Sequence, residues 1–258
     1  MYRPSYWMRI SGVPILSRQQ IDHIGEKIIY DFCPDAMRTP QAIDIDLFVE
    51  EYLKMQVDYQ YLSNNGIYLG MTVFFDSDRV IIYDKEKDQA DYMFVKGNTV
   101  LIDRGLLEES QLRRYRFTMG HEAAHGFLHK EYFSRLKEKR IAARENVSLI
   151  PCRVSETPNS DLKKVEWTDY DWLEWQANTL SSAILMPKTM VEVAVADLRD
   201  RAIFPEEYTF RVANIFNVSK EAADHRLKQL GLYTNQLWKF PNLNRIWHIH
   251  QEATNREI

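Results

Sequence analysis

Two histidines four residues apart, with a glutamate directly after the first, are the residues of this chain best suited to chemistry. They are His121, Glu122 and His125 in the segment FTMGHEAAHGFLH. An α-helix turns by about 100° per residue, so both imidazoles project from one face, one turn apart, with the carboxylate beside them. Two such imidazoles can take two corners of a zinc tetrahedron, and the carboxylate can reach a water on the metal. The pattern is short, however, and an ordinary helix that carries histidines also satisfies it.

A zinc site with two histidines needs a third protein ligand and a position left for water. Glu174 is the leading candidate, because it lies on a second predicted helix downstream, and Asn178 one turn later could orient a ligand histidine. His129 shares the face of His121 and His125. One straight helix cannot place three consecutive turns around one tetrahedral ion, so we interpret His129 as a helix-end residue that favours the negative end of the helix dipole.

Hydrolysis of an amide bond is the reaction that these residues support. A bound metal would acidify a water molecule, and Glu122 would take its proton and later pass it to the leaving amine. We expect one Zn²⁺ per chain, held by His121, His125 and Glu174. Histidine and glutamate ligands also accept manganese or iron, so other divalent ions remain alternatives.

Strand-like stretches precede the motif helix, bounded by turn signals. They are GMTVFF at 70–75, RVIIYD at 79–84 and NTVLID at 98–103. Two amphipathic helices come earlier, one opened by a capping box of Ser17 and Gln20 and one over residues 45–55. A short turn at Arg104 and Gly105 then leads into the motif helix.

A sheet that precedes the motif helix suits a zinc peptidase, because the strand nearest the helix can pair with an extended peptide. We expect the strand at 98–103 to be this edge strand, with Val100, Leu101 and Ile102 beside the substrate backbone. The alternative is that the same strand lies in the interior of the sheet.

Two regions flank the predicted ligand helix. Residues 131–168 are strongly charged, and we interpret them as an insertion, favouring a solvated surface segment over one that reshapes the cleft. Cys152 could cap the metal as a thiolate, although an ordinary loop thiol is the preferred interpretation.

Residues 206–231 have the pattern of a helix-turn-helix. Their basic and acidic residues balance, which favours packing on the core over DNA binding.

Three segments together resemble the ImmA/IrrE family of zinc metallopeptidases. They are RFTMGHEAAHGFLH, EWQANTLSSAILMP and FNVSKEAADHRLKQLGL, and the resemblance spans about residues 75 to 233 in order. It implies that His121, His125 and Glu174 are the zinc ligands and that Glu122 is the catalytic glutamate. The family is known for cleaving helix-turn-helix transcriptional repressors, often encoded beside the peptidase, so the resemblance implies a substrate of that class.

Composition and charge exclude several other classes. The chain has 258 residues with 45% hydrophobic and 27% charged side chains, which is typical of a folded globular protein. A net charge of -4 gives no general electrostatic reason to expect nucleic acid or an anionic membrane as partner. Without a run of about 18 apolar residues or a secretory signal, we expect a cytoplasmic protein with no membrane partner. Cys33 and Cys152 are then expected to be free thiols.

We therefore predict an α+β, zincin-like metallopeptidase with a small mixed or antiparallel sheet packed on helices and a helical C-terminal region. The expected division is an aromatic N-terminal segment (1–16), a peptidase domain (17–200), a helix-turn-helix-like subdomain packed on the core (201–233) and a C-terminal tail (234–258). We expect the aromatic segment to pack on the core rather than occupy the cleft. The predicted function is an endopeptidase acting on a regulatory protein. The alternatives are a zinc-bearing binding module without activity and a DNA-binding regulator.

Overall fold

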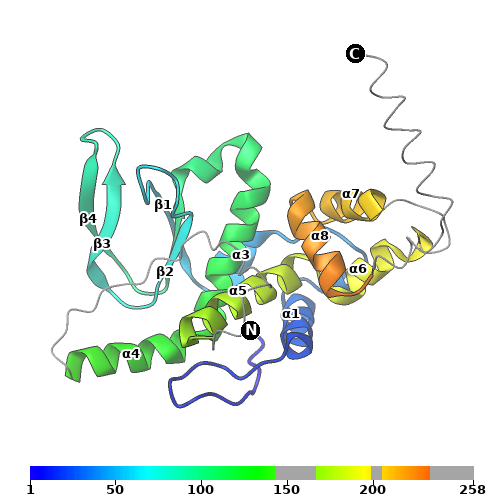
Figure 1. Ribbon diagram of the computed structural model, residues 1–258, viewed down its shortest axis with the longest axis horizontal. Coiled ribbons are helices and arrows are strands. Elements are labelled where there is room, and N and C mark those ends of the chain that lie inside the picture. The colour runs from blue at the N-terminus through cyan, green and yellow to red at the C-terminus, as the bar shows by residue number, and fades with distance from the viewer. Residues whose placement is uncertain (143–166, 199–204, 233–258) are drawn as a thin grey trace.

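The structure, a computed structural model, describes residues 1–142, 167–198 and 205–232 (Figure 1). In these ranges it is an α+β fold. The helices are α1 (Arg18–Phe32), α2 (Ile45–Leu47), α3 (Leu112–Leu128), α4 (Lys130–Ala142), α5 (Asp169–Leu185), α6 (Lys188–Ala194), α7 (Pro205–Ile215) and α8 (Lys220–Gln229). Shorter helical turns are η1 (Pro34–Met37), η2 (Phe48–Tyr52), η3 (Arg104–Leu107), η4 (Glu109–Gln111) and η5 (Ala196–Leu198).

The centre of the molecule is α5, which packs against α1 on one side and α3 on the other (Figure 1). Small residues allow both helix pairs to approach closely. A Cβ atom on Gly25 would lie 2.7 Å from the Cβ of Ala183, and one on Gly120 would lie 2.7 Å from the Oγ of Ser181. The motif helix and the predicted ligand helix are therefore held in direct contact.

The strands form two separate sheets. One has the order β1-β5-β2, in which β1 (Gln56–Gln60) is parallel and β2 (Gly70–Val73) antiparallel to β5 (Thr99–Asp103). The other is a hairpin of β3 (Ser77–Asp84) and β4 (Gln89–Val95), which stands away from the helices in Figure 1. The small mixed sheet agrees with the fold class predicted from the sequence.

The prediction that β5 is the edge strand was wrong. Val100, Leu101 and Ile102 are fully buried in the middle strand, hydrogen-bonded to β1 on one side and to β2 on the other. The physical reason is β1, which the apolar pattern did not reveal because its sequence, QVDYQ, is polar and its residues are only partly buried. The edge nearest α3 belongs to β2 instead, since β2 pairs with β5 and packs against α3.

Local differences from the sequence prediction occur on both sides of the sheet. The helix expected over residues 45–55 is a short α2 that continues into the π-helical turn η2. The expected turn at Arg104 and Gly105 is longer, because η3 and η4 precede the start of α3 at Leu112. The capping box at Ser17 was predicted correctly: its side chain accepts from the backbone N–H of Gln20.

The C-terminal helix pair, α7 and α8, packs on the core. Phe216 and Leu227, from the turn after α7 and from α8, are fully buried in the main hydrophobic cluster. Arg226 is also fully buried; its Nη1 donates to Asp22 Oδ1 at 2.6 Å and its Nε to the carbonyl of Met186 at 3.1 Å. This cluster connects α8 to α1 and to the end of α5.

The aromatic N-terminal segment lies partly on the core. Tyr2 and Tyr6 are half-buried against the main hydrophobic cluster, as expected, whereas Trp7 is 84% exposed. Among the described residues, no helix is both long and apolar enough to cross a membrane.

Candidate metal centre

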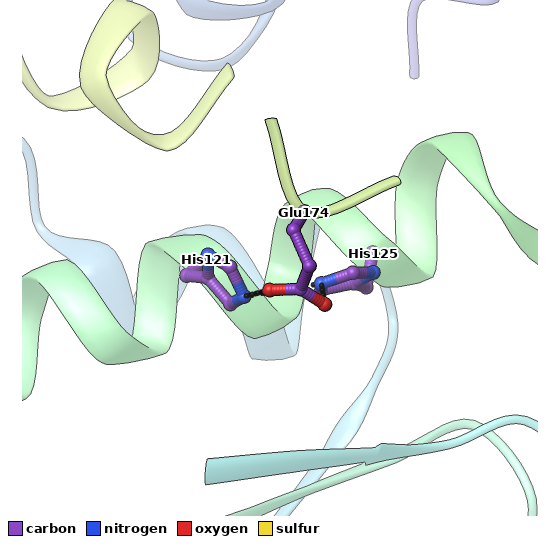
Figure 2. A group of neighbouring side chains, drawn as sticks. All are labelled: His121, His125 and Glu174. Carbon is purple, nitrogen blue, oxygen red and sulfur yellow. Dashed lines mark hydrogen bonds and ion pairs between the residues drawn. The ribbon is translucent and has the colours of Figure 1, made fainter. Parts of the chain in front are cut away.

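Three of the predicted site residues come together where α3 crosses α5 (Figure 2). The Nε2 atoms of His121 and His125 lie 3.0 Å apart. Glu174 places Oε2 at 3.4 Å from His121 Nε2 and Oε1 at 3.4 Å from His125 Nε2. These donor atoms all lie within 4.8 Å of one another, so a single ion could contact all three side chains.

Local structure explains why these side chains meet. The two histidines are one helical turn apart on α3, as their spacing predicts. The helix α5 begins after Thr168, whose side chain forms a capping box with Asp171 and thereby sets where the turn that carries Glu174 begins. The close contact at Gly120 then brings that turn onto the histidine face of α3.

The donor set suits a catalytic zinc ion, which takes two imidazoles and one carboxylate and keeps a position for water. The three residues are at most 9% exposed, so their lone pairs are largely removed from water. Burial alone would raise the pKa of Glu174, but the imidazoles of His121 and His125 outweigh it and hold that pKa below its usual range. Burial likewise opposes charge on His121, yet Glu174 and Glu122 raise its pKa. The site therefore attracts positive charge.

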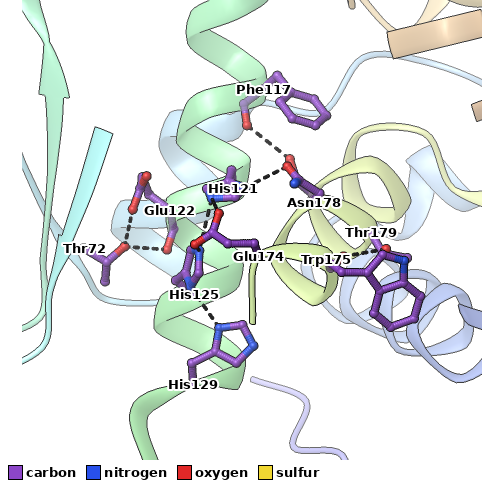
Figure 3. Close-up of polar contacts among 11 residues, drawn as sticks. Thr72, Phe117, His121, Glu122, His125, His129, Glu174, Trp175, Asn178 and Thr179 are labelled. Atoms are coloured by element: carbon purple, nitrogen blue, oxygen red, sulfur yellow. Dashed lines mark hydrogen bonds and ion pairs between the residues drawn. The ribbon is translucent and has the colours of Figure 1, made fainter. Parts of the chain in front are cut away.

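Glu122 lies beside the cluster and is fixed by β2 (Figure 3). The hydroxyl of Thr72 lies 2.7 Å from Glu122 Oε2 and 2.9 Å from the carbonyl of the same residue. A Cβ atom on Gly70 would lie 2.8 Å from Glu122 Oε1, so only glycine allows the strand to approach this carboxylate so closely. Sequence analysis missed both residues, because no local pattern shows which strand lies against the motif helix.

Asn178 lies where the sequence predicted, with Oδ1 at 2.9 Å from His121 Nδ1 (Figure 3). His129 does follow the last residue of α3, but the interpretation that it favours the helix dipole was wrong. It is completely buried, and burial lowers its pKa well below the usual value, so it does not carry the charge that the dipole would favour. Its ring contacts His125 and Gln176 instead.

A small pocket opens beside the cluster, and apolar side chains form much of its wall. Its lining residues are Thr72, Phe74, Glu122, His125, Phe133, Tyr170, Leu173 and Glu174. Phe133 comes from α4 and stacks on Phe74, with ring centroids 4.2 Å apart. The preference for a purely solvated insertion at 131–168 is therefore wrong for its described part, because α4 contributes to the pocket wall. Cys152 lies outside the described residues.

Comparison with known proteins identifies one family. Residues 153–228 match the family model described as IrrE N-terminal-like domain (Peptidase_M78). This range contains Glu174 and Asn178 but begins after His121 and His125. No curated protein matches the chain. The match covers the segment EWQANTLSSAILMP and most of FNVSKEAADHRLKQLGL, but not the segment with the two histidines. The mixed α+β architecture agrees with the zincin-like fold of this metallopeptidase-type family. The match over residues 153–228 supports a relationship between this chain and the ImmA/IrrE family.

Proposed function

We propose that this protein is a zinc-dependent endopeptidase, with one zinc ion per chain, that cleaves a regulatory protein in the cytoplasm. The observation that carries the proposal is the convergence of His121, His125 and Glu174 beside the buried carboxylate of Glu122. Helix-turn-helix transcriptional repressors are the proposed substrate class, because proteins of this kind are what the family resemblance implies.

The side chains divide the work between binding and proton transfer. A zinc ion held by His121, His125 and Glu174 would supply Lewis acidity to a water molecule and to the scissile carbonyl. Glu122 takes a proton from the attacking water and delivers it to the leaving amine. Thr72 holds Oε2 of this carboxylate, which leaves Oε1, the oxygen next to Gly70, as the one better placed for the transfer.

An extended substrate could pair with β2. The N–H of Asp103 donates to the carbonyl of Leu69 at 2.9 Å, and alternation along an antiparallel strand then turns the backbone groups of Gly70 and Thr72 away from β5. Within the described ranges β2 has β5 as its only strand partner. A peptide paired at this edge would lie beside Glu122.

The DNA-binding alternative has less support. A recognition helix needs basic side chains that are free to reach phosphates and base edges. In α8, Arg226 is fully buried against Asp22, and Lys228 pairs with Asp224 at 2.6 Å. We therefore propose no direct contact with nucleic acid.

The test of the proposal combines metal analysis with cleavage. Protein purified without chelator is analysed for metal by mass spectrometry, and wild type is compared with Glu174→Ala. Each of the two proteins is then incubated with purified helix-turn-helix proteins encoded near its gene, and the products are identified by mass spectrometry. We expect about one zinc per chain, lost in Glu174→Ala, and cleavage by wild type.

Glu122→Gln separates a peptidase from a binding module. Loss of the proton carrier should abolish cleavage while zinc content and substrate binding are kept. Glu50→Gln, on an exposed side chain of η2, is the matched control and should cleave like wild type. Absence of zinc from wild type, even after titration, would reject the proposal. Cleavage that survives in Glu122→Gln would reject the role of Glu122.

A further inference from the structure

A buried chain of polar contacts extends from Nδ1 of His125, the ring nitrogen that does not face His121 and Glu174. His125 Nδ1 lies 2.9 Å from His129 Nδ1, and His129 Nε2 lies 3.1 Å from Gln176 Oε1. Gln176 Nε2 donates to the carbonyl of Pro14 at 2.7 Å. Three of these residues, His125, His129 and Gln176, are at most 5% exposed. The contacts join α3, α5 and the N-terminal segment.

Only one placement of hydrogens satisfies all three contacts when both rings are neutral. The Pro14 carbonyl is an acceptor only, so the amide nitrogen of Gln176 must face it and Oε1 must face His129. Oε1 also accepts only, so His129 must carry its proton on Nε2. Its Nδ1 then has a lone pair and accepts from His125, which must carry a proton on Nδ1.

Burial supports the neutral form of His129 that this placement needs. Its ring is fully removed from solvent, and the partner of its Nε2 is an uncharged amide oxygen, so a charged imidazolium would be costly there. A doubly protonated His129 would place two N–H groups in a buried site and remove the acceptor at Nδ1.

We infer that His129 is a positioning residue, which holds His125 in the tautomer protonated on Nδ1 and so directs the lone pair of Nε2 towards His121 and Glu174. The inference rests on the metal site proposed above. It assigns a role to Gln176 and to the Pro14 carbonyl as well, because they determine which nitrogen of His129 is protonated. Ligand histidines commonly have such a partner at the second nitrogen, and its loss costs about 10-fold to 100-fold in metal affinity.

His121 and His125 are thus both protonated on Nδ1, but each has a different hydrogen-bond partner at that nitrogen. Asn178 Oδ1, at 2.9 Å, accepts directly from His121 Nδ1. For His125, a second imidazole stands where the acceptor must be, and an imidazole accepts only in one tautomer. Gln176 selects that tautomer of His129, whereas the amide oxygen of Asn178 is always an acceptor and needs no such partner.

The direct test is nuclear magnetic resonance of the imidazole nitrogens in metal-free wild type. Long-range correlation between ring protons and ¹⁵N shows which nitrogen of each histidine is protonated. We expect a proton on Nδ1 of His125 and on Nε2 of His129, and the same pattern after zinc is added. An unprotonated Nδ1 on His125 would overturn the inference, whether or not the protein binds zinc.

A pair of substitutions tests the consequence for metal binding. His129→Leu removes the acceptor, whereas His129→Asn keeps an amide oxygen near the position of Nδ1. Zinc affinity is measured by competition with a chromogenic chelator. We expect His129→Leu to bind about 10-fold or more weakly and His129→Asn to recover most of this loss. His23→Leu, at an exposed position of α1, is the control and should match wild type.

The outcomes separate this inference from the proposed function. Wild type that binds zinc while His129→Leu binds equally tightly would overturn the inference and leave the peptidase proposal standing. An equal loss in the Leu and Asn variants would also overturn it, because packing rather than the acceptor would then matter. Gln176→Leu should reduce affinity in the same direction but by less, since His129 can then adopt either tautomer.

Discussion

Two buried polar clusters lie along α5, and they differ in where their positive charge comes from. Near the C-terminal end of the helix, Arg226 brings a guanidinium to Asp22 and to the carbonyl of Met186. Near the N-terminal end, His121, His125 and Glu174 present lone pairs to one another. The first cluster contains its own cation. The second needs a proton or a metal ion, which is why we interpret the first as structural and the second as functional.

The largest effect should come from breaking the structural cluster. Arg226→Met leaves Asp22 buried without its partner, which should lower the free energy of unfolding by about 3–5 kcal/mol. Burial lowers the pKa of Arg226 despite Asp22, and its Nη2 has no hydrogen-bond partner within the described residues, so the pair is costly to maintain. The double substitution Asp22→Leu with Arg226→Met should therefore recover most of the loss. Denaturant unfolding measures both.

Zinc affinity is the control for this experiment. If the two clusters are independent, Arg226→Met should bind zinc as tightly as wild type under native conditions. A large loss of zinc affinity in this variant would show that the C-terminal helix pair supports the metal site. The two clusters would then not be independent.

A bound metal ion should stabilise the folded protein only through the second cluster, which consists of His121, His125 and Glu174. Free zinc at about 1,000 times its Kd should raise the free energy of unfolding by about 4 kcal/mol. Glu174→Ala should lose this increase, since it removes one of the three converging ligands. Glu50→Ala, an exposed residue of η2, should keep it. Thermal unfolding with and without zinc is the measurement, and an equal increase in the Glu174 and Glu50 variants would place the ion elsewhere.

Separating α3 from α5 should affect the metal centre in particular. Gly120→Ala would place a Cβ 2.7 Å from Ser181 Oγ, an overpacking that should cost about 1–3 kcal/mol of stability and weaken zinc binding. Adding Ser181→Ala should restore both, because the Cβ of Ser181 is 3.6 Å away. If the double variant binds zinc as weakly as Gly120→Ala alone, the close contact between α3 and α5 is not what aligns the ligands.

The smallest effect is expected at Thr72, which contacts the carboxylate but none of the three ligands. Thr72→Val removes the hydroxyl that lies 2.7 Å from Glu122 Oε2, at a cost of about 1 kcal/mol in stability. We expect kcat to fall and zinc affinity to stay constant. Thr72→Ser retains a hydroxyl and should retain activity. A loss of zinc in Thr72→Val would mean that β2 shapes the metal site itself.

Local patterns predicted the helices better than the strands. The capping box at Ser17 and the periodic apolar residues of α1 and α5 are readable within one segment. The strand β1 is polar, and β5 was misplaced at the edge because the sequence does not show its partner. Strand order in this sheet depends on paired residues that are 26 (Val73 and Thr99) to 43 (Gln56 and Thr99) positions apart, and no local periodicity encodes it.

The sequence by itself determined that His121 and His125 share one face with Glu122 beside them, because i,i+4 spacing on a helix is a local property. It also indicated Glu174 and Asn178, through a second helical pattern and the family resemblance. Only the tertiary structure decided that Thr72 holds Glu122 and that His129, Gln176 and Pro14 form one chain behind His125. These contacts join elements that are distant in sequence, and the packing of α3 against α5 and β2 creates them.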